Sequence, residues 1–205
     1  MLSTIISMTL FALIGAISPG PVNIISTGAG ANFGFRGALA FVLGATVSYT
    51  LVVFLVGIGL NTILETFPQI TRSLQYIGGA FLLYMSYKIA TAAPVESTAS
   101  NASTSKKKPP NFIEGVLAQG LNPKAWLVSM SGVSLFVSAN SPAFLYLLIF
   151  YAISFIICFI GVGTWAVMGQ FISTFLSTEK QQRRFNIIMG LLLASTVIFI
   201  MTAKL

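Results

Sequence analysis

The stretch GAISPGPVN, residues 15–23, places two prolines around a glycine inside a long apolar segment. Proline within a helix removes a backbone hydrogen bond and clashes with the carbonyl group four residues earlier, at a cost of about 3 kcal/mol or more. The segment from Met1 to Phe35 contains no ionisable side chain, and apolar segments of that length are typical of membrane spans. The sequence therefore predicts a membrane helix that is interrupted near its middle.

The composition of the rest of the chain agrees with a membrane location. Of its 205 residues, 56% are hydrophobic and only 7% are charged, whereas soluble domains carry about 25% charged residues. The mean hydropathy is +0.90. We therefore predict an all-α integral membrane protein with the lipid bilayer as its surroundings. Its six transmembrane helices are expected at residues 2–28, 38–60, 74–92, 112–136, 143–171 and 185–201.

One long connection divides the predicted spans into two groups. Residues 93–111, APVESTASNASTSKKKPPN, are rich in Ser, Thr and Ala, then tribasic, then Pro-Pro, a composition typical of a flexible linker. The linker separates a first three-helix half, residues 1–92, from a second, residues 112–205. Because each half has an odd number of spans, the second half enters the membrane from the opposite face. This pattern predicts two inverted repeats.

Basic residues predict the orientation of the chain. Only Arg72 and Lys204 lie on the side of the loops after the second and fourth spans. The other side holds Arg36, Lys88, Lys106, Lys107, Lys108, Lys180, Arg183 and Arg184. Positively charged loops stay cytoplasmic, so we predict a multi-pass membrane protein with both termini on the opposite, outer side. The net charge of +7 then reflects topology, and no nucleic-acid partner is expected.

Several residue types needed for catalysis or metal binding are absent. The chain has no His, no Asp and one cysteine, Cys158, and its four acids lie at or near predicted span ends: Glu65, Glu96, Glu114 and Glu179. Metal sites need clustered His, Cys or carboxylates, and hydrolases need a base or a carboxylate pair. We therefore expect no metal, no cofactor and no enzymatic activity, and no carboxylate proton relay across the membrane.

A second interruption resembles the first. GLNPKAW, residues 120–126, puts Asn122 before Pro123 in the first span of the second half, as Ser18 precedes Pro19 in the first half. Interrupted spans in matching positions point to a binding site near the middle of the bilayer. The predicted substrate-binding residues are Ser18, Pro19, Gly20, Pro21, Asn23, Gln119, Asn122, Pro123 and Lys124.

The two interruptions suit a zwitterionic ligand. The prolines remove the helical donors of the carbonyls of Gly15, Ile17 and Gln119. Unpaired carbonyls are tolerated in a membrane only where they face protein or a water-filled cavity, and there they can hold an ammonium group. The N-terminus of a restarted helix offers N–H groups to a carboxylate. An amino-acid substrate satisfies both ends, although proline kinks that only shape helix packing remain the alternative.

Lys124 is the only basic residue predicted deep in the membrane. It lies about 16 Å into its span at about 1.5 Å per residue, where a lysine costs about 2.5–3.5 kcal/mol on insertion scales. We interpret it as the partner of the substrate carboxylate, with a side chain that extends toward the membrane surface as the alternative. Secondary polar candidates are Tyr49, Tyr84, Trp126 and Gln170.

Four segments resemble the LysE/RhtB family of amino-acid exporters over essentially the whole chain: SPGP (18–21), GFRGAL (34–39), GGAFLLYMSYKIA (78–90) and LNPKAW (121–126). WAVMGQFI (165–172) and RRFNIIMGLLL (183–193) look more narrowly like its cysteine/O-acetylserine exporter branch. The resemblance implies export of small amino acids from the bacterial cytoplasm through the inner membrane, so the outer side on which both termini are predicted is the periplasm. Many members have asparagine directly after PGP, where this chain has Val22 followed by Asn23, so a family contact through that asparagine is in doubt here.

Two other classes of function stay open. A passive channel would need a polar lining without preference for one substrate, and a non-transporting subunit of a membrane complex would not move solute alone. The sequence names neither the amino acid nor a coupling ion, and it leaves homo-oligomer formation open.

Overall fold

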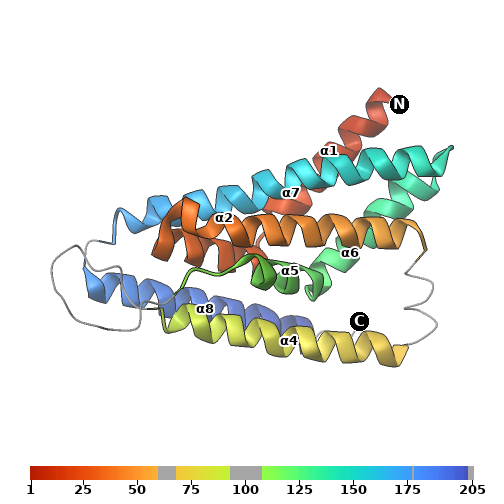
Figure 1. Ribbon diagram of the computed structural model, residues 1–205. Coiled ribbons are helices and arrows are strands. Elements are labelled where there is room, and N and C mark those ends of the chain that lie inside the picture. Colours follow the sequence, from red (N-terminus) through yellow and green to blue (C-terminus); the bar gives the residue numbers. More distant parts are fainter. Residues whose placement is uncertain (60–67, 93–107, 177, 203–205) are drawn as a thin grey trace.

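The computed structural model describes residues 1–59, 68–92, 108–176 and 178–202, and within these ranges the chain forms helices and no strand (Figure 1). The elements in chain order are α1 (Leu2–Ile17), α2 (Pro21–Gly57), α4 (Pro68–Ala90), α5 (Phe112–Gly120), α6 (Pro123–Gly132), the π-helical turn η1 (Val133–Ser138), α7 (Ala143–Ser173) and α8 (Glu179–Thr202). The all-α prediction is confirmed for the described residues.

Both predicted interruptions are present. The predicted span at residues 2–28 consists of α1, which ends at Ile17, and the start of α2 at Pro21. The predicted span at residues 112–136 is likewise divided between α5 and α6, which begins at Pro123. In each case proline is the first residue of the restarted helix, where its missing N–H group is not needed.

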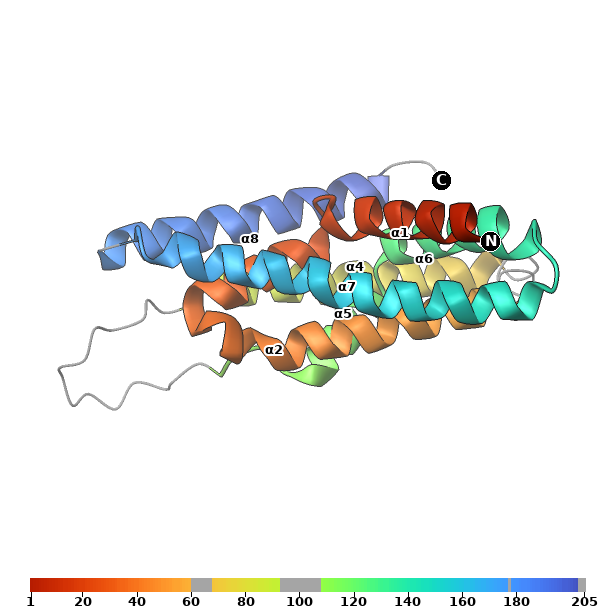
Figure 2. The same cartoon turned by 90° about the horizontal axis from the view of Figure 1, so that it is seen from above.

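Helix α2 reverses direction at Gly34. Its φ of 70° and ψ of 171° lie in a region that side-chain-bearing residues rarely adopt. The turn separates a first limb, residues 21–33, from a second limb, residues 35–57 (Figure 2). The backbone N–H of Phe35 donates to the Gln170 side-chain oxygen at 2.6 Å, which ties the turn to α7. This reversal is the predicted connection between the first and second spans.

Several predicted boundaries were wrong because a helix can continue beyond its apolar segment. Helix α4 covers 68–90 instead of 74–92, and α8 begins at Glu179 instead of residue 185. An acidic residue in the first turn is favoured by the helix dipole, which explains the earlier start of α8. Of the predicted linker, residues 93–107 lie outside the described ranges, as do Glu65 and Glu96.

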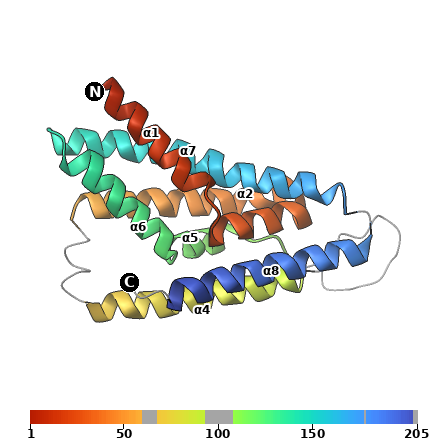
Figure 3. The same cartoon turned by 180° about the vertical axis from the view of Figure 1, so that it is seen from behind.

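Helices from the two predicted halves pair with each other. The second limb of α2 packs along α7, and α4 packs along α8, with the short helices α5 and α6 beside α2 (Figures 1 and 3). Helix α1 packs against α7 on the other side. The second limb of α2 and α7 correspond to the second predicted span of each half, and α4 and α8 correspond to the third. Each long pair therefore joins spans with the same place in the two predicted halves. The count of six spans and the inverted repeat remain predictions.

Glycines bring the backbones of α2 and α7 into contact. A Cβ atom on Gly30 would overlap the Ala166 carbonyl, and one on Gly169 would overlap the Thr27 carbonyl. Small residues allow such close approach between helices in membranes, where van der Waals packing and hydrogen bonds replace the hydrophobic effect as the source of association. The glycines therefore fix the position of the first limb of α2 beside α7.

Apolar side chains also cover the outside of the bundle. On α1, Ile6, Leu10, Ile14 and Ile17 recur every three or four residues and are all exposed. Soluble monomers rarely expose long apolar stripes. Among the described helices, α2 and α7 are long and apolar enough to cross a bilayer by length and composition. Both observations agree with the predicted membrane location.

Candidate functional site

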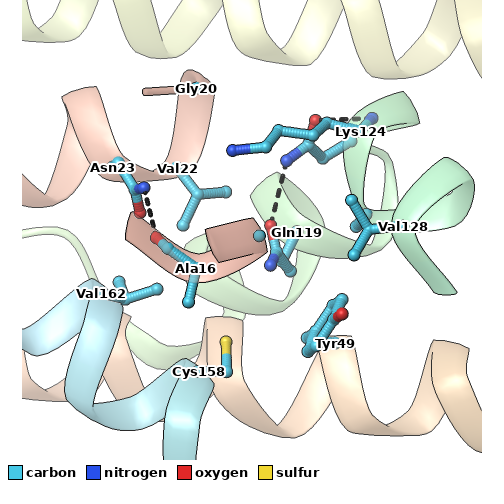
Figure 4. A pocket seen from close by; sticks show the side chains of 13 residues that line it. Ala16, Gly20, Val22, Asn23, Tyr49, Gln119, Lys124, Val128, Cys158 and Val162 are labelled. Carbon is cyan, nitrogen blue, oxygen red and sulfur yellow. Dashed lines mark hydrogen bonds between the residues drawn. The ribbon is translucent and has the colours of Figure 1, made fainter. Parts of the chain in front are cut away.

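The two helix breaks meet around one cavity. It contains about 420 Å³ of empty space, including the part open to the surroundings (Figure 4). Its walls come from the end of α1, the start of α2, the α5–α6 break and the middle of α7. The lining residues are Gly15, Ala16, Gly20, Val22, Asn23, Tyr49, Gln119, Asn122, Lys124, Ala125, Val128, Cys158 and Val162.

Lys124 connects the second break to the first. It sits in the first turn of α6, and its ammonium group donates to the carbonyl of Ser18 at 2.6 Å and lies 3.4 Å from that of Pro19. The side chain passes over Gly20, whose position would place a Cβ atom 3.1 Å from the lysine Cδ. The ammonium group is thus held at the opposite break, and its side chain is directed into the bundle in this conformation.

Asn23 holds the first break together. Its side-chain amide donates to the carbonyl of Ala16 at 2.8 Å and to that of Ser18 at 3.0 Å, and only 5% of the residue is exposed. These bonds join the end of α1 to the start of α2. Val22, which follows the second proline, lines the cavity with an apolar side chain.

The second break has a similar amide network. The side-chain oxygen of Asn122 accepts from the backbone N–H of Lys124 at 3.2 Å and so caps α6. Its amide nitrogen donates to the Gln119 side-chain oxygen at 3.1 Å, and both residues are buried. The indole N–H of Trp126 donates to the Gly120 carbonyl at 2.8 Å, a stabilising contact that the sequence analysis did not foresee.

Two of the carbonyls freed by proline already have donors. The carbonyl of Gly15 accepts from the Ser18 hydroxyl at 3.1 Å, and that of Gln119 accepts from the Asn122 backbone N–H at 3.1 Å. A carbonyl oxygen has two lone pairs, so the predicted contact of these carbonyls with a substrate ammonium group stays a prediction. Polar residues next to the prolines replace the lost helical donors, as an apolar environment demands.

The predicted site residues take two different places. Five of them line the cavity: Gly20, Asn23, Gln119, Asn122 and Lys124. Four others belong to the breaks without lining it: Ser18, Pro19, Pro21 and Pro123.

Of the secondary candidates, Tyr49 lines the cavity and the other three do not. Tyr84 is 54% exposed, so it lies away from the site. Trp126 donates a hydrogen bond to the Gly120 carbonyl at the second break, and Gln170 accepts one from the Phe35 N–H at the turn after Gly34.

The wall contributed by α7 was not predicted. Cys158, interpreted from sequence as a packing residue, is 3% exposed and lines the cavity together with Val162 (Figure 4). Nothing in the sequence distinguishes these two residues from the other apolar residues of α7. The small side chains here and on the α1 wall leave room for a short ligand side chain.

The cavity combines one positive group with polarised backbone donors. Lys124 is the only charged residue in its lining. The first N–H groups of a helix have no partner within the helix, and no side chain caps the start of α2 at Gly20. A cation beside a positive helix end favours an anionic group. Within the described residues, no three His, Cys, Asp or Glu side chains gather as metal ligands.

The helical bundle has exposed apolar stripes and polar breaks beside a central cavity, which agrees with a membrane protein that binds a polar ligand. The LysE type translocator model matches residues 13–204, and the chain belongs to this family. The chain is 29% identical over 187 residues to the cysteine/O-acetylserine efflux protein of Salmonella typhimurium and 27% identical to that of Escherichia coli. Each alignment covers 89% of this chain and 90% of the relative. No solved structure matches the chain significantly.

Proposed function

We propose that this chain exports a small neutral amino acid across the bacterial inner membrane and binds it in the central cavity. The observation that carries the proposal is the contact of Lys124 with Ser18, which joins two helix breaks 106 residues apart around one cavity. The family and the names of its relatives support amino-acid efflux. At 27–29% identity, cysteine and O-acetylserine are candidates for the substrate.

The substrate carboxylate is assigned to Lys124 and the start of α2. The ammonium group of Lys124 already lies at this helix end, where it bonds the Ser18 carbonyl. The backbone N–H groups of Val22 and Asn23 fall in the first turn, where intrahelical partners are missing. A carboxylate that binds here replaces one carbonyl contact of the lysine with a hydrogen bond in which both partners are charged, so Coulomb attraction adds to the bond.

The substrate ammonium group is assigned to neutral oxygens on the opposite wall. Gln119 offers its side-chain oxygen, which accepts one bond from Asn122 and has a second lone pair. Tyr49, also in the lining, offers its hydroxyl oxygen. A zwitterionic amino acid then has a partner at each end, Lys124 for its carboxylate and these oxygens for its ammonium group.

The cavity walls favour a short side chain. Ala16, Val22, Cys158 and Val162 are small and mostly apolar. Adding or removing one methylene group of a ligand in an apolar pocket changes the binding free energy by about 1–3 kcal/mol. Such walls therefore discriminate between side chains by size. We therefore propose a short, uncharged side chain such as that of cysteine, serine or O-acetylserine, and rejection of long cationic amino acids.

We propose that movement of one half of the chain against the other opens the cavity alternately to the two sides of the membrane. Helix α2 packs against α7, and α4 packs against α8. This pairing supports an inverted repeat, because the second predicted span of one half meets the second of the other, and the third meets the third. In such folds, one repeat rocks against the other around a fixed midplane site. The proposed orientation places both termini in the periplasm and the basic loops in the cytoplasm.

The test is efflux from liposomes that contain the purified protein. We expect faster loss of cysteine, O-acetylserine and serine than of lysine, relative to protein-free liposomes. Unlabelled substrate on the far side should accelerate efflux of labelled substrate, which a passive channel would not show. No transport of any amino acid would favour a non-transporting subunit instead.

A further inference from the structure

A second cavity lies beside the first limb of α2. It contains about 380 Å³ of empty space, including its open part, and its lining is almost entirely apolar. The walls come from the first limb of α2, the end of α4 and the segment before α5. The lining residues are Ile25, Gly28, Ala29, Asn32, Phe33, Met85, Lys88, Ile89, Ala92 and Pro110.

An ion pair between the two halves stands at the edge of this cavity. The ammonium group of Lys88, on α4, lies 2.6 Å from a carboxylate oxygen of Glu114, on α5. The side chains are 30% and 15% exposed, so the pair is only partly screened by solvent. Among the described residues it is the only ion pair, and it joins the end of the first half to the start of the second.

A pair of amides makes a second connection between the halves. Asn32, on α2, and Asn186, on α8, exchange hydrogen bonds of 2.7 and 2.8 Å, and both residues are buried. Asn186 also donates to the carbonyl of Ala92, at the end of α4, at 3.2 Å. Two polar connections between the halves, the ion pair and the amide pair, therefore lie around the second cavity.

One helix face leads from this cavity to the central site. Val22 lines the central cavity, and Ile25, Ala29 and Asn32 line the second. These four residues are three or four positions apart, so they fall on the same face of the first limb. Ile25 and Met85, each 1% exposed, fill the inner end of the second cavity.

We propose that the second cavity is the cytoplasmic antechamber of the transport path and that the Lys88–Glu114 pair is the latch that closes it. The proposal rests on the proposed function. Arg36 lies at the start of the second limb of α2, four residues after Asn32, and Lys180, Arg183 and Arg184 lie in the first two turns of α8, which also carry Asn186. The positive-inside rule places these basic residues, and the cavity beside them, on the cytoplasmic side. A zwitterionic amino acid matches both members of the pair, its carboxylate facing Lys88 and its ammonium group facing Glu114, and so competes with the latch.

Glu114 has a structural role that the experiment must separate from the latch. Its carboxylate accepts from the Asn111 backbone N–H at 2.9 Å, while the Asn111 side chain accepts from the Glu114 N–H, which together form a capping box. Glutamine is also suited to this position in a capping box. Glu114→Gln therefore keeps the cap and removes the charge, and Lys88→Gln breaks the pair without touching the cap.

The experiment measures access to a cysteine placed inside the second cavity. In a Cys158→Ala background, Ala29→Cys provides a single thiol at a position that is 4% exposed. Inverted membrane vesicles are treated with a small, membrane-impermeant methanethiosulfonate. We expect Lys88→Gln and Glu114→Gln each to raise the rate of modification roughly tenfold, since hydrogen bonds to charged groups are worth at least that factor in an equilibrium constant.

The matched control is Glu179→Gln, which removes an acidic charge in the first turn of α8 and should leave the rate unchanged. Unchanged rates in both latch variants would overturn the proposal. Acceleration by only one of the two latch variants would also overturn it, because removal of either partner breaks the same ion pair. Failure of the unaltered chain to export any amino acid would contradict the proposed function instead, and the labelling rates would still decide whether the pair closes the cavity.

Discussion

At the scale of single residues, the surroundings of Lys124 favour the binding of an anion. Its ammonium group lies beside the positive end of α2 and is held there by the Ser18 carbonyl. The cavity lining contains no acid to balance it. A partly buried cation needs compensation, which the Ser18 carbonyl supplies in part. A substrate carboxylate completes that compensation.

Replacement of Lys124 tests this interpretation. Loss of a charged hydrogen-bond partner costs about 1.5–3 kcal/mol, or roughly 10- to 150-fold in affinity. Lys124→Met should insert normally and lose most export, while Lys124→Arg should keep a fraction because it retains the charge. The measurement is amino-acid uptake into inverted vesicles at matched protein levels.

Lys180→Met is the control for this change, because it removes a basic residue at the exposed start of α8. Its uptake should equal that of the unaltered chain. Full activity of Lys124→Met would remove the lysine from the site and would favour a purely structural role for its bond to Ser18.

Gly20 tests the position of the lysine rather than its charge. An added Cβ atom would lie 3.1 Å from the Lys124 Cδ and 3.3 Å from its Nζ, so the side chain must move. The φ of Gly20 is −176°, an extended conformation that alanine adopts without strain. Gly20→Ala should therefore fold normally but raise the KM for export several-fold. An unchanged KM in vesicle transport assays would show that the lysine has room to bind substrate from a shifted position.

At the scale of elements, the restarted helices depend on the glycine contacts between α2 and α7. The first limb of α2 is short and has no side-chain cap at its start, so its position depends on packing against α7. Gly30 and Gly169 bring the two backbones together there. Any larger residue must separate the helices, because a carbonyl of the partner backbone cannot move as a side chain can.

Gly169→Ala is expected to destabilise the protein. Its Cβ atom would overlap the Thr27 carbonyl, and overpacking of this kind typically costs about 1–3 kcal/mol. Gly163→Ala, on the same helix, is the matched control: its nearest contact would be the Phe35 ring at 3.8 Å, an ordinary distance. Thermal unfolding in detergent should show a lower midpoint for Gly169→Ala alone. Equal midpoints would mean that the α2–α7 contact is looser than described.

At the scale of the whole molecule, the arrangement of the halves has a consequence for orientation. The loop at residues 139–142, before α7, and the start of α8 at Glu179 are at opposite ends of α7. If α7 crosses the bilayer, these two places face different compartments. The basic start of α8 is then cytoplasmic, and the loop before α7 is periplasmic.

Two introduced cysteines test the orientation. In a Cys158→Ala background, Lys180→Cys should react with an impermeant maleimide only in inverted vesicles, and Ser141→Cys only in intact cells with a permeabilised outer membrane. Both parent residues are exposed. Labelling of Lys180→Cys from the periplasm would reverse the proposed topology, and labelling of both from one side would contradict a membrane-spanning α7.

The sequence alone determined the features that depend on local chemistry. Proline ends or restarts a helix wherever it stands, so the breaks after Ile17 and Gly120 could be located without a structure. Composition likewise indicated the membrane location, and four segments indicated the family. All nine predicted site residues lie at these breaks, and five of them line the cavity.

Only the tertiary structure decided which residues complete the site and which elements meet. Cys158 and Val162 approach the breaks from a helix far along the chain, and the Lys88–Glu114 pair joins the two halves. The physical reason is that lipid is as apolar as the interior of the bundle. Lipid-facing and cavity-facing positions of a span therefore carry similar side chains, and hydrophobic periodicity does not separate them. The packing of the helices makes that distinction.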